Sequence, residues 1–311
     1  MRIKQYITDF LKSTSEFGFP ISWRLYLKYR LSGIESGERD VLISNDVAEY
    51  FWNHYSYLVN QKDIETEDLY DENNSPIWIF WWQGKDNMPK IVKACYNSIC
   101  NNAPEKHPVV LLTKENYRQF AHLPEFIIKK AESKDLSLAH FSDIIRANLI
   151  TLHGGLWLDA TMFISKPIPE ELFKKDFFSP IPYFRGKKYK NYSWCCFAWG
   201  GKKGNLVHGN LYKFFIQYWK DHQMLITYLW QDDYVKMMYN HFPKIREVID
   251  YGGIPTTGLF EMQQVLGDPY DDSYYKKLIK ENTYHKLTYK RGNIIGKEIP
   301  TFYDHIVNEL K

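Results

Sequence analysis

Three charged side chains between residues 142 and 163 have a spacing that suits a site for an anionic, hydroxyl-rich ligand. Asp143 and Arg146 are three positions apart and lie on one face of a predicted helix. Two glycines end that helix, and a short apolar run then leads to Asp159. Open α/β sheets bind ligands beside the carboxyl ends of their strands. The pattern therefore indicates a site for a sugar nucleotide.

Each of these groups has a defined use in sugar transfer. Asp159 could hold a divalent ion against a departing diphosphate, because such ions are bound through carboxylate oxygens. The Asp143 carboxylate could accept hydrogen bonds from sugar hydroxyls, and the Arg146 guanidinium could donate to sugar or phosphate. The structural alternatives are an Asp159 that caps a turn and a surface ion pair worth less than ~1 kcal/mol.

Strands and helices are predicted to alternate from Pro76 onward and to position these side chains. The predicted strands are 77–82, 109–112 and 156–158, and the predicted helices are 89–101 and 137–153. Strands separated by helices imply a mostly parallel sheet with helices on both faces. We therefore predict an α/β fold for residues 71–311.

Residues 1–70 are predicted to be a helical N-terminal extension. One face of its first helix is apolar, formed by Ile3, Tyr6, Ile7, Phe10 and Leu11. Residues 1–31 contain six Arg or Lys against two Asp or Glu, a local charge of +4. Either this segment lies on an anionic membrane surface, or its apolar face packs on the main domain, which is the commoner use of such a helix.

The composition restricts the class of protein. A net charge of +3 is too small to indicate nucleic acid as the main partner. The aromatic content of 17% is typical of a protein whose rings stack on sugars or bases, but a thick aromatic core would explain it equally well. The four cysteines do not have the spacing of metal ligands. The sequence shows no signal peptide and no apolar run of the ~20 residues that a membrane span needs. These features favour a cytoplasmic protein. Its membrane contact would be peripheral, at the inner face of the plasma membrane.

Several segments resemble the bacterial capsular polysaccharide synthesis proteins, a group similar to glycosyltransferase family 32. S-D-I-I-R at 142–146, followed by G-G-L-W-L-D-A-T at 154–161, resembles the sugar- and metal-binding region of that family. I-W-I-F-W-W-Q-G at 77–84 resembles its first nucleotide-binding strand. I-P-T-T-G-L at 254–259 and H-K-L-T-Y-K at 285–290 resemble its C-terminal signatures.

The resemblance implies a GT-A fold, a nucleotide-diphosphate-sugar donor and transfer with retention of anomeric configuration. The nucleotide that the resemblance favours is UDP. By position, Asp143 and Arg146 would bind the donor sugar, and Asp159 would be the first Asp of a D-x-D motif that contacts ribose and metal. Trp81 or Trp82 would lie against the base, although some side chains of an alternating strand must be core.

The D-x-D motif is degenerate, because Thr161 stands where the second Asp is expected. An uncharged hydroxyl is a poorer ligand for Mn²⁺ or Mg²⁺, so either another ligand is needed or transfer is independent of metal. His285 is the predicted additional ligand, since neutral imidazole suits Mn²⁺; the alternative is a partly exposed histidine that follows a turn. Lys286 and Lys290 could neutralise the departing diphosphate, or could simply be solvated surface residues.

The predicted function is that of a retaining glycosyltransferase. It would move a hexose from a UDP-sugar to a growing capsular or surface polysaccharide or to a lipid-linked oligosaccharide. Asp232 and Asp233 are candidates for an acceptor-side base, but a front-face mechanism would need none. The degenerate motif leaves one alternative, a non-catalytic protein that binds nucleotide-sugars or glycans on a decayed GT-A scaffold.

Overall fold

The structure, a computed structural model, describes residues 2–62, 74–184, 187–188, 192–290 and 299–310. The chain forms two compact units. Unit 1 comprises 1–63, 123–147 and 206–247, and unit 2 comprises 64–122, 148–205 and 248–311. The predicted boundary at residue 70 lies outside the described residues.

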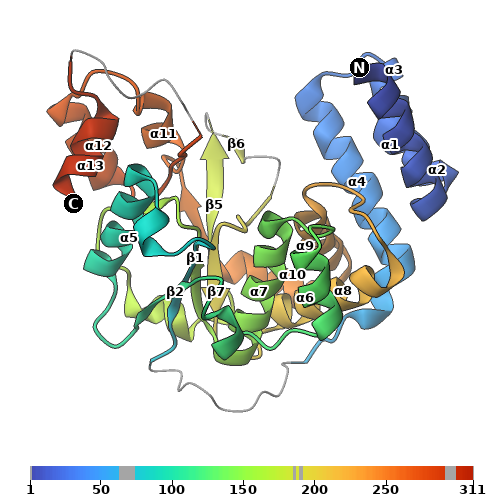
Figure 1. Cartoon of the computed structure of the whole chain (residues 1–311), viewed down its shortest axis with the longest axis horizontal. Helices are drawn as coiled ribbons and strands as arrows, with labels where there is room; N and C mark the ends of the chain where they lie inside the picture. Colours follow the sequence, from blue (N-terminus) through green and yellow to red (C-terminus); the bar gives the residue numbers. More distant parts are fainter. Residues whose placement is uncertain (1, 63–73, 185–186, 189–191, 291–298, 311) are drawn as a thin grey trace. The chain divides into compact units, whose positions relative to one another are not determined.

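Unit 2 contains a four-stranded sheet with the order β2-β1-β3-β7; Figure 1 labels β1, β2 and β7 of this sheet. β1 (Ile77–Phe80) is parallel to both β2 (Val109–Leu112) and β3 (Gly155–Leu158). β7 (Ala198–Gly201) runs antiparallel beside β3. The three predicted strands are therefore present, and the mostly parallel sheet confirms the predicted α/β fold of GT-A type.

The side chains of β1 are buried on both faces of the sheet, which explains its continuous apolar sequence. Ile77 and Ile79 belong to a core cluster that also contains Val92 and other residues of α5 (Lys90–Asn102). Trp78 points the other way, contacts the rings of Phe120 and His153, and donates its indole N–H to the Gly154 carbonyl at 2.9 Å.

Two glycines connect α7 (Leu138–His153) to β3, as the sequence predicts. Gly154 and Gly155 have φ angles of +67° and +95°, a region that side-chain-bearing residues rarely adopt. A Cβ on Gly155 would lie 2.0 Å from the Pro76 carbonyl oxygen. This close approach lets β3 start directly beside β1 and sets where Asp159 emerges.

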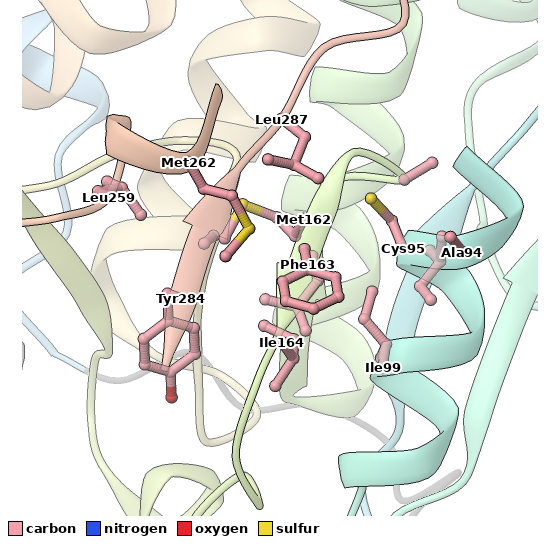
Figure 2. Close-up of a cluster of buried hydrophobic side chains, with 14 of the residues drawn as sticks. Ala94, Cys95, Ile99, Met162, Phe163, Ile164, Leu259, Met262, Tyr284 and Leu287 are labelled. Atoms are coloured by element: carbon pink, nitrogen blue, oxygen red, sulfur yellow. The ribbon is translucent and has the colours of Figure 1, made fainter. Parts of the chain in front are cut away.

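The rest of unit 2 is made of two smaller sheets and short helices. β4 (Met162–Ile164) pairs antiparallel with β9 (Tyr284–Lys286). Figure 2 shows the β4 side chains between Cys95 and Ile99 of α5 on one side and Leu259 and Met262 on the other. The remaining elements are β5 (Ser179–Phe184), β6 (Lys187–Lys188), β8 (Gly253–Thr256), α11 (Glu261–Val265), α12 (Asp272–Glu281) and α13 (Phe302–Glu309).

Unit 1 is helical, and its core is aromatic. α4 (Ser36–Tyr55) packs on α9 (Trp230–His241) and approaches α8 (Leu206–Asp221), with Phe51 against both Phe214 and Tyr234. The Phe214 and Tyr234 rings stack with centroids 3.8 Å apart. Unit 1 also contains α6 (Glu125–Glu132) and the first ten residues of α7, while α10 (Pro243–Gly252) begins in this unit and ends in unit 2.

The N-terminal helix α1 (Arg2–Phe17) divides its predicted apolar face between two environments. Tyr6 and Phe10 pack edge-on against Tyr26, in the helical turn that follows α2 (Phe19–Trp23). Ile7 and Leu11 remain 52% and 60% exposed. Among the described helices, none is both long and apolar enough to cross a bilayer.

Candidate active site

The carboxyl ends of β1 and β3 mark the topological switch point of the unit 2 sheet. From β1 the chain first forms β2 on one side of β1 and later forms β3 on the other side. The order of the strands therefore reverses between β1 and β3. Ligands of open α/β sheets bind at such a point. Trp81 and Trp82 follow β1, which ends at Phe80 and is two residues shorter than predicted, and Asp159 follows β3. The structure thus brings these three residues to one edge.

Asp159 is held firmly at this edge. Its backbone N–H donates to the Phe197 carbonyl at 2.9 Å, and its own carbonyl accepts from the Met162 N–H at 2.8 Å. One carboxylate oxygen, Oδ1, accepts from the Trp157 indole at 2.9 Å, and the other, Oδ2, from the Lys286 ammonium at 2.8 Å. The side chain is still 31% exposed, so a ligand can reach it.

Lys286 comes to this carboxylate from β9. Its Nζ lies 2.8 Å from Asp159 Oδ2, 2.8 Å from Thr161 Oγ1 and 4.7 Å from the centre of the Phe197 ring. The pairing of Met162 with Lys286 in the β4–β9 ladder fixes its position along the strand. The side chain is 18% exposed. Asp159, Thr161 and Lys286 therefore form one compact cluster, which we call the D-A-T/Lys cluster.

His285 lies on the opposite face of β9 from Lys286, because successive side chains of a strand alternate. Its ring is fully buried beside Phe163, and Nε2 lies 3.1 Å from the Ser165 hydroxyl. Burial lowers its pKa to about 4, so the ring is neutral near pH 7. The structure places this predicted metal ligand in the core and does not bring it to the D-A-T/Lys cluster.

The groups around Asp159 do not fit a divalent ion. Mg²⁺ and Mn²⁺ need several oxygen or nitrogen ligands. Here Asp159 Oδ1 accepts from the Trp157 indole, and both Asp159 Oδ2 and Thr161 Oγ1 accept from the Lys286 ammonium. An ammonium cannot ligate a metal and would repel one at this spacing. Within the described ranges, no cluster of three or more His, Cys, Asp or Glu is arranged to hold a metal ion.

Aromatic rings flank the same edge of the sheet. Trp81 meets Tyr289 edge-on with centroids 5.5 Å apart, and Trp82 lies tilted against Tyr117 at 5.6 Å. Both indoles are partly exposed and could receive a stacked base. Lys290, next to Tyr289, is exposed.

Sequence reasoning did not single out Trp157, Phe197 or Tyr289. Trp157 had a usable signal, because it lies two residues before Asp159 and so on the same face of the strand. Phe197 and Tyr289 are brought to the site by pairing between distant segments, which no local pattern records.

Asp143 and Arg146 form an ion pair within unit 1. Arg146 Nη2 donates to Asp143 Oδ1 at 2.8 Å, and the Arg146 and Asp143 side chains are only 4% and 12% exposed. Nearby, burial and then the positive charge of Arg146 lower the pKa of His208 to about 3. The pair is therefore a buried interaction and not the surface pair considered above. Its assignment to the donor sugar stays a prediction.

Asp233 has a structural position in unit 1. Its two carboxylate oxygens accept from the Ser44 hydroxyl at 2.6 Å and the Thr227 hydroxyl at 2.8 Å. Asp232 beside it is also buried. This geometry favours a role in joining α4 to α9 over that of an acceptor-side base.

Comparison with known protein families identifies the family to which the chain belongs. Residues 35–306 match the family described as capsular polysaccharide synthesis protein, a range that contains β1, the D-A-T segment and β9. No curated protein matches the chain. Because the family match spans most of the sequence, the chain belongs to the capsular polysaccharide synthesis proteins, with a role in polysaccharide biosynthesis.

Proposed function

We propose that this protein is a retaining glycosyltransferase that moves a hexose from a UDP-hexose to a growing capsular or surface polysaccharide, built on a lipid-linked oligosaccharide. The observation that carries the proposal is the D-A-T/Lys cluster at the switch point of the sheet, with Trp81 and Trp82 at the same edge. A nucleoside diphosphate has a flat base, which can stack on an aromatic side chain, and a charged diphosphate, which a cation can bind.

Each group has a role in this proposal. Trp81 or Trp82 stacks on the base, and the Asp159 carboxylate accepts a hydrogen bond from the ribose. Lys286 and the exposed Lys290 lie in the segment that supplies positive charge to the diphosphate, where negative charge grows as the glycosidic bond breaks. Asp143 and Arg146 hold the donor sugar through its hydroxyls.

The transfer step needs no protein nucleophile. The acceptor oxygen attacks the anomeric carbon from the face that the diphosphate leaves, so the configuration is retained. The bond from that carbon to the phosphate oxygen breaks as the new glycosidic bond forms. The departing phosphate oxygen takes the proton of the acceptor hydroxyl, which agrees with the structural position of Asp233.

A lipid-linked acceptor agrees with the surface of the N-terminal helices. Ile7 and Leu11 of α1 and Phe19 and Trp23 of α2 are exposed apolar side chains. The Phe19 and Trp23 rings stack on one another at 6.1 Å, so they form one aromatic surface. Residues 1–31 carry a local charge of +4, which suits an anionic cytoplasmic leaflet. This segment is the proposed peripheral membrane contact.

The test is release of UDP from a panel of UDP-hexoses in the presence of lipid-linked acceptor. Wild-type protein should release UDP from one donor, and Asp159→Asn should abolish release. Asp272→Asn is the matched control, because the exposed Asp272 carboxylate on α12 pairs with Lys276 and accepts from the Tyr270 hydroxyl, and contacts no residue of the proposed site. Binding of a donor without release would instead support the non-catalytic alternative, which the degenerate D-A-T motif leaves open.

A further inference from the structure

The D-A-T/Lys cluster contains a cation that belongs to the protein itself. We infer that the Lys286 ammonium takes the place of a divalent ion in this site, so that the protein binds a nucleoside diphosphate without metal. The inference rests on the proposed function, since it assumes that a nucleoside diphosphate binds here. It assigns Lys286 to the phosphates as a direct ligand.

The hydrogen bonds of Lys286 leave room for a phosphate. A lysine ammonium has three N–H donors. Two point to Asp159 Oδ2 and Thr161 Oγ1, each 2.8 Å away. The third donor can meet a phosphate oxygen on the exposed side of the group. The Phe197 ring, 4.7 Å away, adds a cation–π contact that helps to hold the ammonium in place.

Thr161 allows the Lys286 ammonium to replace a metal ion, because its side chain is uncharged. Two carboxylates at positions 159 and 161 would carry a charge of −2 and would need a divalent ion before a diphosphate could approach. With threonine, Asp159 and Lys286 balance one another, and the hydroxyl accepts a hydrogen bond without adding charge. The substitution that weakens a metal site is therefore the one that suits an ammonium.

The position of the ammonium is fixed before any ligand binds. The Lys286 backbone N–H donates to the Leu259 carbonyl at 2.7 Å, and the Leu287 N–H donates to the Thr161 carbonyl at 2.9 Å. These bonds hold β9 beside the D-A-T segment. A cation that is already in place stabilises developing negative charge without reorganisation.

The experiment is calorimetric titration of the full chain with UDP, and with GDP, ADP and CDP in turn, in EDTA and in Mn²⁺. We expect one nucleotide to bind with the same affinity in both buffers. Lys286→Met should lower that affinity about 10- to 100-fold, the range for loss of one charge-assisted hydrogen bond. Lys276→Met removes a 70% exposed lysine of α12 and should change nothing.

Two further measurements separate the role of Lys286 from simple misfolding. The free nucleoside lacks phosphates, so Lys286→Met should bind it as wild type does. The double variant Thr161→Asp/Lys286→Ala restores two carboxylates and removes the ammonium, and it should bind the diphosphate only when Mn²⁺ is present.

The outcomes are distinguishable. Binding by the wild type that is lost in EDTA, or a Lys286→Met variant that binds the diphosphate normally, would overturn the inference and leave the transferase proposal standing. Absence of binding to every nucleotide in both buffers would overturn the proposed function and this inference with it.

Discussion

The exposed apolar side chains of α1 give a direct test of the proposed membrane contact. We change Ile7 and Leu11 to glutamine in one double variant. Glutamine forms helices about as well as leucine and better than isoleucine, and it carries no charge. The side chains that pack α1 into unit 1, Tyr6 and Phe10, are unchanged. The variant therefore changes the exposed surface of the helix and keeps the aromatic contacts of Tyr6 and Phe10 with Tyr26.

The magnitude follows from the exposed fractions. Full burial of a leucine or isoleucine side chain contributes about 1.5–3 kcal/mol. Ile7 and Leu11 are 52% and 60% exposed, so insertion into a membrane interface would yield roughly half of that for each. The double variant should lose about 1.5–3 kcal/mol of binding free energy, which is roughly a 10- to 150-fold weaker partition coefficient.

The assay is co-sedimentation with vesicles that contain anionic lipid, beside vesicles of neutral lipid. Wild-type protein should bind the anionic vesicles, and added salt should weaken binding because the basic side chains of residues 1–31 contribute. Ile299→Gln is the control, since Ile299 is also exposed, at 62%, and lies in unit 2. If the double variant and the control bind alike, or the wild type binds no vesicles, α1 is not a membrane contact.

Two further predictions concern stability. Arg146→Ala should lower the free energy of unfolding by about 3–5 kcal/mol, because it removes the guanidinium that pairs with the mostly buried Asp143 carboxylate. The double variant Asp143→Leu/Arg146→Met should lose less, and equal losses in urea denaturation would contradict this account. Burial lowers the pKa of His285 to about 4 from 6.5, so the stability that it contributes is present above pH 6.5 and is lost as the pH falls toward 4. His285→Gln should reduce this pH dependence of the unfolding free energy, and an unchanged pH profile would show that His285 is not its source.

The sheet of unit 2 could be predicted from the sequence because its strands are short, apolar and bounded by turn residues. β1 and β3 are interior strands with side chains buried on both faces, so each forms a continuous apolar run. β2 is an edge strand and is only partly buried, but its four residues are also all apolar. The strand assignment also predicts that Trp81 and Asp159 lie at the same edge of the sheet. It does not predict the last residue of β1, because Trp81 and Trp82 are as apolar as the strand but lie beyond its end.

Burial of the charged pair on α7 could not be predicted. The spacing of Asp143 and Arg146 places them on one face of a helix, but the sequence does not say what covers that face. In unit 1 the Arg146 and Asp143 side chains are only 4% and 12% exposed. The same limit applies to α1, where Tyr6 is packed and Ile7 is exposed although both belong to one apolar pattern.

The assignment of the residue that faces Asp159 depends on strand register. His285 and Lys286 are adjacent in sequence, and on chemical grounds either could serve a diphosphate site, one through a metal and the other as a cation. Only the pairing of β9 with β4 decides which side chain faces the cluster, and a slip of one residue would exchange them. That pairing joins segments about 120 residues apart, so no local pattern contains it.

The packing of both faces of β9 opposes such a slip. It would move the Lys286 ammonium into the buried space beside Phe163, where an uncompensated charge is costly. It would also move the His285 ring, which burial keeps neutral, to the carboxylate of Asp159. The fold thus has one arrangement in which the charge lies at the exposed edge and the neutral ring in the core. The same packing that stabilises β9 therefore places an ammonium, and not an imidazole, beside the Asp159 carboxylate.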